Sequence, residues 1–199
     1  MTKDFYSIMK ARRSCYEISP ESNVSDERIA EVIKDAILCA PSAFNSQSGK
    51  VILLLKAAHK QLWHLTKGIL KDMVSPENWP QTESKMDAFA NGYGTVLYFD
   101  DAAIVEGLQQ KFPLYSNNFP VWAQQSNGIL QYMIWTSLHA EGFGASLQHY
   151  NPLIDTMVRE TWQVPDGWVL TAQMPFGVPA KQPDAKNKLP VEERFIMYS

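Results

Sequence analysis

The longest apolar segment of this chain places the strongest limit on its fold. It begins after Pro120 and runs to about Glu141 as WAQQSNGILQYMIWTSLHAE, with helical spacing and apolar side chains around most of its circumference. A chain of 199 residues has a limited core in which to hide such a helix. We therefore expect this helix to lie centrally in the fold or at a subunit interface, and we expect a dimer.

Helical and strand patterns alternate along the rest of the chain. Helices are predicted at residues 3–13, 25–41, 59–73, 81–92 and 152–162, and strands at residues 50–56, 95–99, 145–150 and 168–177, with a strand-like FIMY near the end. Ser25 is the expected N-cap of the second helix, and Asp101 the expected cap of a helix after the second strand. The apolar run KVILLLK predicts a strand buried on both faces. No repeat or long linker divides the chain, so we expect one α+β domain over residues 1–199.

Composition excludes several classes of protein. The net charge of −3 and the absence of lysine runs argue against nucleic-acid binding. No segment approaches the roughly 18 apolar residues of a membrane span, and the charged N-terminal segment lacks the apolar core of a signal peptide. Cys15 and Cys39 form no CxxC pair, which favours a cytoplasmic protein. The histidines show no metal-ligand spacing and no GxSxG motif is present, so we expect neither a metal site nor a serine hydrolase.

Arg12, Arg13 and Ser14 end the first helical segment and form a candidate anion site. A guanidinium group is a planar fork that fits phosphate oxygens in a bidentate manner, and a neighbouring hydroxyl adds a short donor. The alternative is a solvated helix end, because arginine near a helix C-terminus also interacts favourably with the helix dipole.

Two connections carry more polar groups than a plain turn needs. PSAFNSQSGK, residues 41–50, crowds serine, asparagine and glutamine between a helix and a strand. Amide side chains donate and accept, which suits the polar edge and polyol of a cofactor, although an ordinary polar loop is also consistent with the pattern. EGFGASLQHYNP, residues 141–152, has two glycines, which permit a close approach of the backbone to a neighbouring group. A lone histidine there, His149, is more often structural than catalytic. In the tail, Lys186 and Lys188 either add positive charge to a site or are simply solvated.

In this order, the four segments resemble the nitroreductase family of FMN-dependent oxidoreductases. The segments RRSCY, PSAFNSQS, GYGTVLYF, KFPLYSNNFPVW, LQYMIWTSLHAEGFGASLQHYNPLID and AQMPFG look like the subgroup that contains the yeast fatty-acid-repression-mutant-like nitroreductases and their bacterial relatives. The resemblance spans nearly the whole chain, and LQHYNP together with MPFG is specific to that subgroup.

The resemblance implies a fold, a cofactor and a shared site. The fold is α+β, with helices around a central, mostly antiparallel sheet, in a homodimer with two FMN sites across the interface. By resemblance, Arg12, Arg13 and Ser14 hold the flavin phosphate and ribityl chain, Lys186 reaches the same end, and the loop around residues 41–47 comes from the partner subunit. The FMN-binding residues that the resemblance implies are Arg12, Arg13, Ser14, Pro41, Ser42, Ala43, Asn45, Gln47, Lys85, Leu147, Gln148, His149 and Lys186. Of these, Leu147 to His149 match a segment along the isoalloxazine ring, and Lys85 matches only loosely.

The implied activity is hydride transfer from NAD(P)H through flavin to a nitroaromatic or quinone acceptor by a ping-pong mechanism. No side chain is required as a catalyst, and we expect His149 to act by hydrogen bonding or packing. Two departures from the wider family affect one phosphate contact and one wall of the substrate channel: Tyr16 replaces a second basic residue, and Gln47-Ser48-Gly49 replaces QPW. The alternative function is a redox-silent flavin- or ligand-binding regulatory protein.

Overall fold

The computed structural model describes residues 4–199. The helices are α1 (Phe5–Ala11), α2 (Asp26–Cys39), α3 (Lys56–Lys71), α4 (Trp79–Ala90), α5 (Ala102–Lys111), α6 (Phe119–Ala140) and α7 (Asp155–Trp162). The strands are β1 (Ile18–Ser19), β2 (Gly49–Leu55), β3 (Gly94–Asp101), β4 (Gly144–Ala145) and β5 (Trp168–Pro179). Short 3₁₀ helices are η1 (Ala43–Asn45), η2 (Pro113–Asn118) and η3 (Val191–Glu193).

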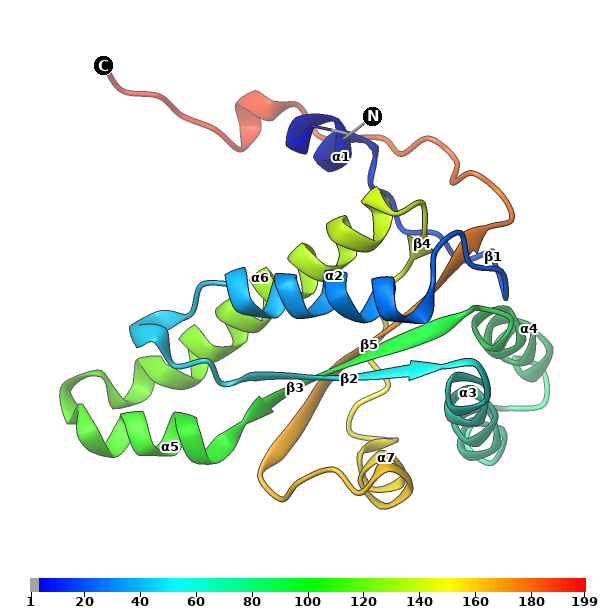
Figure 1. The fold of residues 1–199 in the computed structure, drawn as a ribbon, viewed down its shortest axis with the longest axis horizontal. Helices are drawn as coiled ribbons and strands as arrows, with labels where there is room; N and C mark the ends of the chain where they lie inside the picture. The colour runs from blue at the N-terminus through cyan, green and yellow to red at the C-terminus, as the bar shows by residue number, and fades with distance from the viewer. Residues whose placement is uncertain (1–3) are drawn as a thin grey trace.

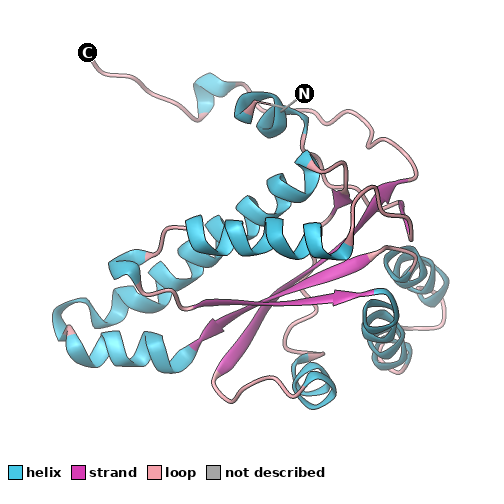
Figure 2. Ribbon diagram, viewed as in Figure 1, coloured by secondary structure: helices cyan, strands magenta, loops and turns pink. Residues whose placement is uncertain are grey.

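One antiparallel sheet organises these elements (Figure 2). The strand order is β1-β5-β3-β2, and β4 pairs with β5 beside β1. The register places Gly94 opposite Phe176 in the β3–β5 pair and Gly49 opposite Asp100 in the β2–β3 pair. The expected α+β class with a mostly antiparallel sheet is therefore confirmed.

Two layers of helices cover the sheet, one on each face (Figure 1). On one face, α2 and α6 pack against β3 and β5, with Ile134 and Phe176 fully buried in that core. On the other face, α3, α4 and α7 form a second core around Trp63, Phe89 and Phe99. The central strands β3 and β5 therefore lie between two apolar cores. This position accounts for the nearly continuous burial of β3.

The long apolar helix α6 lies against the sheet as the sequence predicts. Leu130, Ile134 and Leu138 face the core, whereas Val121 and Ile129 remain exposed on this single chain. A helix that is apolar on its exposed side as well needs a further partner. No helix within residues 4–199 is long and apolar enough to cross a membrane.

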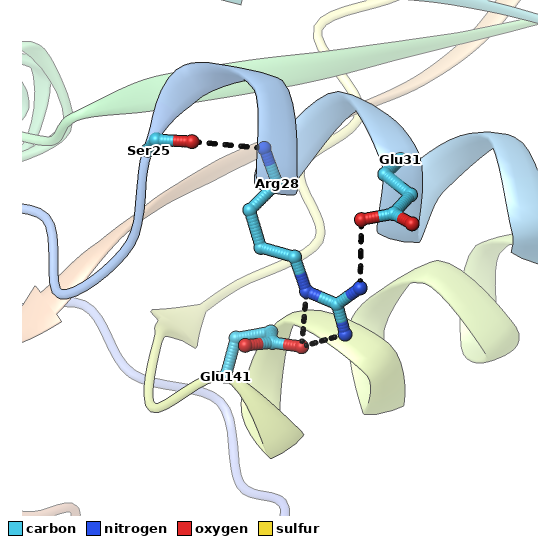
Figure 3. Close-up of polar contacts among 4 residues, drawn as sticks. All are labelled: Ser25, Arg28, Glu31 and Glu141. Atoms are coloured by element: carbon cyan, nitrogen blue, oxygen red, sulfur yellow. Dashed lines mark hydrogen bonds and ion pairs between the residues drawn. The ribbon is translucent and has the colours of Figure 1, made fainter.

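A cluster of polar contacts fixes the start of α2 against the end of α6 (Figure 3). Ser25 Oγ accepts a hydrogen bond from the Arg28 amide at 3.2 Å, which confirms the expected N-cap. The Arg28 guanidinium donates to Glu141 at 2.6 Å and to Glu31 at 2.8 Å. These pairs are exposed, so each contributes at most about 1 kcal/mol, but together they orient the chain as it enters β4.

The structure differs from the sequence-based expectation at two strands. β2 is an edge strand in which only Leu54 is fully buried, so the prediction of burial on both faces was wrong for this chain. The expected strand 145–150 is mostly irregular: β4 ends at Ala145, and beyond it only Gln148 forms an isolated bridge, to Gln173. Residues 146–150 therefore run beside β5 without forming a regular strand.

At the chain ends, the expected helix 3–13 is observed as α1, and residue 3 lies outside the described residues. Asp101 caps α5 as predicted, accepting from the Ala103 amide at 3.2 Å. Residues 195–198 form no strand, and their side chains are exposed at the end of a tail that leaves the body of the fold (Figure 1).

Candidate functional site

The Arg-Arg-Ser motif lies beside the segment that follows α6. Ser14 forms a parallel bridge with Ala145, and the Cys15 amide donates to Ala145 O at 2.9 Å. Gly144 permits this approach, because a Cβ at that position would lie 2.8 Å from Cys15 Cβ. Two motifs that are distant in the sequence therefore meet at β4.

The polar tail covers the same region. Arg13 Nη2 donates to Asp184 O at 2.7 Å, and the Ala180 amide donates to Glu17 O at 2.9 Å. A cavity of about 260 Å³ lies between the motif and the tail, and its walls include Arg13, Ser14 and Lys186. The structure thus brings these three predicted residues together at one cavity, which Lys181 and the acidic residues Glu17 and Asp184 also line.

Arg12 precedes these residues in the sequence, does not line the cavity, and packs against α6. Its guanidinium carbon is 4.2 Å from the centroid of Trp135 and 5.9 Å from that of Tyr132. Arg12 Nε and Nη1 are buried and have no hydrogen-bond partner. A buried donor without an acceptor costs roughly 1–3 kcal/mol, which cation–π attraction offsets only in part. Sequence reasoning missed Trp135 and Tyr132, although their i, i+3 spacing on α6 gives them a common face.

The segment 147–149 runs past β5 on this side of the molecule. Leu147 is half-buried and packs against the core under α6, and Gln148 is buried, with Nε2 donating to Ser146 Oγ at 3.0 Å. His149 is exposed. Lys85 of α4 approaches the same segment, because its Nζ lies 5.9 Å from the Tyr150 ring centroid.

The loop 41–47 lies at the other end of α6. The Ala43 amide donates to Ser126 Oγ at 3.3 Å, and the Gln47 amide donates to Ser42 Oγ at 3.0 Å. Ser126 and Trp135 are nine residues apart on α6, a rise of about 14 Å along the helix. The structure therefore does not bring this loop to the Arg-Arg-Ser motif within one chain.

A larger cavity, of about 450 Å³, opens at this loop. It is lined by Ile37, Leu38, Ala40, Pro41, Ser42, Asn45, Gln47, Gly49, Lys50, Val51, Ser126, Leu130 and Trp168. Its volume is within the range of small-molecule sites, and its walls combine apolar side chains with a few amides and hydroxyls. Four of the predicted loop residues line it, and Ala43 lies on the adjoining surface beside Trp122.

Phe44 projects from this loop into a group of aromatic side chains that the sequence analysis did not identify. Its backbone is left-handed, with φ of 55°, and its side chain is 51% exposed. The Phe44 ring stacks on Trp122 with an interplanar angle of 18° and lies 5.0 Å from Phe112 and 5.3 Å from Phe119 between centroids. A bulky residue with positive φ is uncommon and is maintained only by its surroundings.

A carboxyl group is buried at the base of the loop. Asp100 lies opposite Gly49 in the β2–β3 pair and accepts from Ser48 Oγ at 3.4 Å. Burial raises the pKa of Asp100, and hydrogen bonds from Asn127 and Ser48 oppose that effect. Sequence reasoning missed this residue, since an aspartate at a strand end is an ordinary feature.

Comparison with known proteins identifies the family. Residues 9–178 match the sequence model of the Nitroreductase family. The chain belongs to the nitroreductase family. Among curated relatives from Saccharomyces cerevisiae, HBN1 is 32% identical over 185 residues, covering 92% of each chain. The yeast nitroreductase FRM2 is 30% identical over 188 residues, covering 94% of this chain and 93% of FRM2. The expected subgroup is thereby confirmed.

Solved structures of nitroreductases share the fold. Nitroreductase CinD from Lactococcus lactis, in complex with chloramphenicol, superposes with a TM-score of 0.89 at 38% identity, covering 98% of this chain and 100% of CinD. CinD has also been solved in complex with 4-nitrophenol. A structure from Exiguobacterium sibiricum in complex with FMN is 14% identical, with a TM-score of 0.69 and 98% of each chain covered, and shares the fold alone.

The structure also shows where the two expected departures from the wider family lie. Tyr16, in place of a basic residue, is half-exposed at the 260 Å³ cavity, with its ring 6.5 Å from that of Phe89. Ser48, in the Gln47-Ser48-Gly49 segment, is fully buried and bonds Asp100 instead of forming a wall of the loop cavity. Lys181 and Lys186 of the tail line the same cavity as Tyr16.

Proposed function

We propose that residues 1–199 form a single nitroreductase-like domain that binds FMN and transfers electrons from NAD(P)H to a nitroaromatic or quinone acceptor. Membership of the family supports a flavin-dependent oxidoreductase activity in general. The observation in this chain that carries the cofactor assignment is the pair of buried, unpartnered donors on Arg12. Donors that lack an acceptor in the protein fit a bound anion.

The residues that follow Arg12 in the sequence, together with the tail, would also suit the phosphate of FMN. Arg12, Arg13 and Ser14 would hold the phosphate and ribityl chain, and Lys186 would add positive charge from the tail. In the ping-pong reaction that we propose, these residues would hold FMN, which would supply the hydride chemistry between NAD(P)H and the acceptor. The protein supplies binding, orientation and the exclusion of water, so no side-chain nucleophile or base is required.

The segment Leu147–His149 would lie along the flavin ring. Support comes from the bridge between Ser14 and Ala145, which puts this segment next to the proposed phosphate site. Lys85 is near the same segment through Tyr150 and would remain at the rim of the site.

A complete site would require two copies of the chain. The loop 41–47 lies at one end of α6 and the Arg-Arg-Ser motif near the other, so a single chain separates the two groups. A homodimer in which α6 helices meet would bring the loop of one copy to the motif of the other. Exposed apolar side chains on α1 and the tail support such an interface: Phe5, Tyr6, Met9, Phe195, Ile196, Met197 and Tyr198.

The aromatic acceptor would bind at the loop cavity. Phe44 and Trp122 offer a stacked aromatic surface beside it, and aromatic rings favour flat, polarisable ligands. CinD, a protein 38% identical to this chain, forms complexes with chloramphenicol and 4-nitrophenol, which are small aromatic nitro compounds. We propose the same chemical class here.

We also propose a cytoplasmic location. Cys15 and Cys39 are both free thiols, and Cys39 is exposed, as suits a reducing compartment.

The test is anaerobic reduction of the purified protein. FMN absorbance should bleach rapidly on addition of NADH or NADPH and recover on addition of a quinone. Bound flavin that neither nucleotide bleaches would favour the redox-silent flavin-binding alternative. A colourless protein that does not bind added FMN would contradict the cofactor assignment itself.

A further inference from the structure

Gln173, in the middle of β5, holds the segment 148–151 through both its backbone and its side chain. The Gln148 amide donates to Gln173 O at 2.7 Å, and the Gln173 amide donates to Gln148 O at 2.9 Å. Beyond this rung, Gln173 Oε1 accepts from the Tyr150 amide at 2.8 Å, and Gln173 Nε2 donates to Asn151 Oδ1 at 3.0 Å. The side chain thus replaces the next rung of a ladder that the backbone does not continue.

Each polar side-chain atom of Gln173 and Asn151 has a hydrogen-bond partner. Asn151 Nδ2 donates to Leu170 O at 2.6 Å and to Asp155 Oδ1 at 3.1 Å. Gln173 itself has no exposed surface and sits in the strand between Ala172 and Met174, which are also fully buried. A buried amide in an apolar strand lowers stability unless all of its groups are bonded, so its presence calls for a purpose beyond filling the core.

This contact sets the direction of the main chain at His149. Gln148 and Tyr150 both direct their amide N–H groups toward Gln173, so the amide between them points away from β5. Within residues 4–199 the His149 main chain has no hydrogen-bond partner, and its side chain is exposed. The contact with Gln173 therefore leaves the main chain of His149 open on the side away from β5, the side on which Ser14 pairs with Ala145 of the same segment.

We propose that Gln173 is a positioning residue for the flavin ring: it fixes Tyr150 and Asn151 so that the His149 amide donates to the polar edge of the isoalloxazine. The inference rests on the proposed function, because it assumes FMN at this site. Leu147 and His149 would contact the ring, whereas Gln173 would act through the backbone between them and β5.

Hydrogen exchange on the FMN-loaded protein tests this role. In the unmodified protein, the amides of Gln148, His149 and Tyr150 should all be protected. In Gln173→Met, which has similar volume but no amide, Tyr150 and His149 should exchange about tenfold faster, whereas Gln148 stays protected by its backbone pair. The visible absorption spectrum of the bound flavin should shift in the same variant.

Gln109 offers a matched control. It is a part-buried amide, less buried than Gln173, that donates to a backbone carbonyl, Ser116 O at 3.0 Å, and it lies in α5 away from this segment. Gln109→Met should leave the flavin spectrum and the three amides unchanged. A purely structural role for Gln173 would lower the unfolding midpoint in Gln173→Met and leave the His149 exchange rate and the spectrum as they were, which would overturn the proposal.

If Gln173→Met does not fold, hydrogen exchange on the unmodified protein tests the proposal. As FMN occupancy is lowered by dialysis, His149 exchange should accelerate in proportion to the empty fraction, whereas Tyr150 should stay protected. Exchange at His149 that is independent of FMN overturns the proposal while leaving FMN binding and reduction intact. A protein that binds no FMN at all overturns the proposed function, and this inference with it.

Discussion

The guanidinium of Arg12 stacks on the ring of Trp135, with 4.2 Å between the Arg12 carbon and the ring centroid. This contact joins the chain after α1 to the long helix α6. Helix α1 buries none of its own residues, so its position depends on contacts such as this one. It also places Arg12, the residue that we propose binds the phosphate, against α6. In our proposal this helix meets a second copy of the chain.

Replacing Arg12 by alanine should weaken FMN binding while the protein stays folded. A charge-assisted hydrogen bond contributes roughly 1.5–3 kcal/mol, which corresponds to about a 10- to 150-fold increase in the FMN dissociation constant. Fluorescence titration with FMN measures it. Arg159→Ala, at an exposed arginine of α7, is the control and should bind FMN normally. An unchanged dissociation constant in Arg12→Ala would mean that Arg12 only joins the chain after α1 to α6 and does not bind the phosphate.

Mixed dimers should reveal whether the site is shared. Arg12→Ala and Gln47→Leu homodimers should each lose FMN, because each damages both copies of the site. A heterodimer of the two variants would carry one site with both defects and one with none, and should bind about one FMN per dimer. Two affinity tags isolate the heterodimer, and flavin absorbance gives the stoichiometry. No recovery on mixing, or a monomeric mass by light scattering with flavin still bound, would contradict the shared site.

Phe44→Leu should discriminate between acceptors. A stacked aromatic pair contributes about 0.5–1.5 kcal/mol beyond its buried area, so KM for an aromatic nitro compound should rise about 2- to 12-fold. Ferricyanide, which has no ring to stack, should be reduced at the original rate, and the FMN content should not change. Steady-state kinetics with both acceptors makes the comparison. Equal effects on both acceptors would mean that Phe44 supports the loop and does not contact the acceptor.

His149→Gln should have a small effect on acceptor reduction. General acid catalysis typically contributes 10²–10⁴-fold, whereas we expect a loss well under 100-fold, because water reaches an exposed position such as this one. Stopped-flow measurement from about pH 5 to 8 should give pH profiles of the same shape for the oxidative half-reaction in the unmodified protein and in the variant. A larger loss confined to that half-reaction, with flavin content intact, would show that the site uses His149 as an acid.

Acid should destabilise the protein through a buried histidine on α3. His59 is fully buried, its Nδ1 lies 2.7 Å from Thr95 Oγ1, and Trp63 Nε1 donates to that same oxygen at 2.9 Å. Burial lowers the pKa of His59 to about 4 from its ordinary 6.5. Below pH 6.5 the unfolded chain therefore takes up a proton that the folded chain refuses.

The stabilisation by neutral His59 should be complete above pH 6.5 and should be lost as the pH falls toward 4. Its size is at most about 3 kcal/mol in the free energy of unfolding. Urea unfolding at one protein concentration, at pH 7.5 and pH 4.5, measures it. The pH dependence should shrink in His59→Gln and persist in His64→Gln, an exposed histidine of the same helix. Identical pH dependence in both variants would exclude His59 as the cause.

Local patterns in the sequence predicted much of the fold. Ser25 followed by two acidic residues predicted the start of α2. Pro120, in the first turn of α6, and Gly142, just beyond its end, marked the approximate bounds of that helix, because caps and breakers act within a few residues. The burial of β2 was predicted wrongly, since an apolar run shows that a strand is apolar but not which strands lie beside it. The strand order β1-β5-β3-β2 joins segments that are not consecutive, and no local pattern encodes it.

By itself, the sequence determined the approximate positions of most helices and strands, the α+β class and, through its ordered motifs, the nitroreductase family. These depend on side-chain periodicity, capping and residue identity, which are properties of short segments. Only the tertiary structure decided that Arg12 stacks on Trp135, that Gln173 holds the backbone on either side of His149, and that α6 separates the loop 41–47 from the Arg-Arg-Ser motif. Each of these relationships joins distant parts of the chain, because strand pairing and helix packing set distances that spacing along the sequence does not contain.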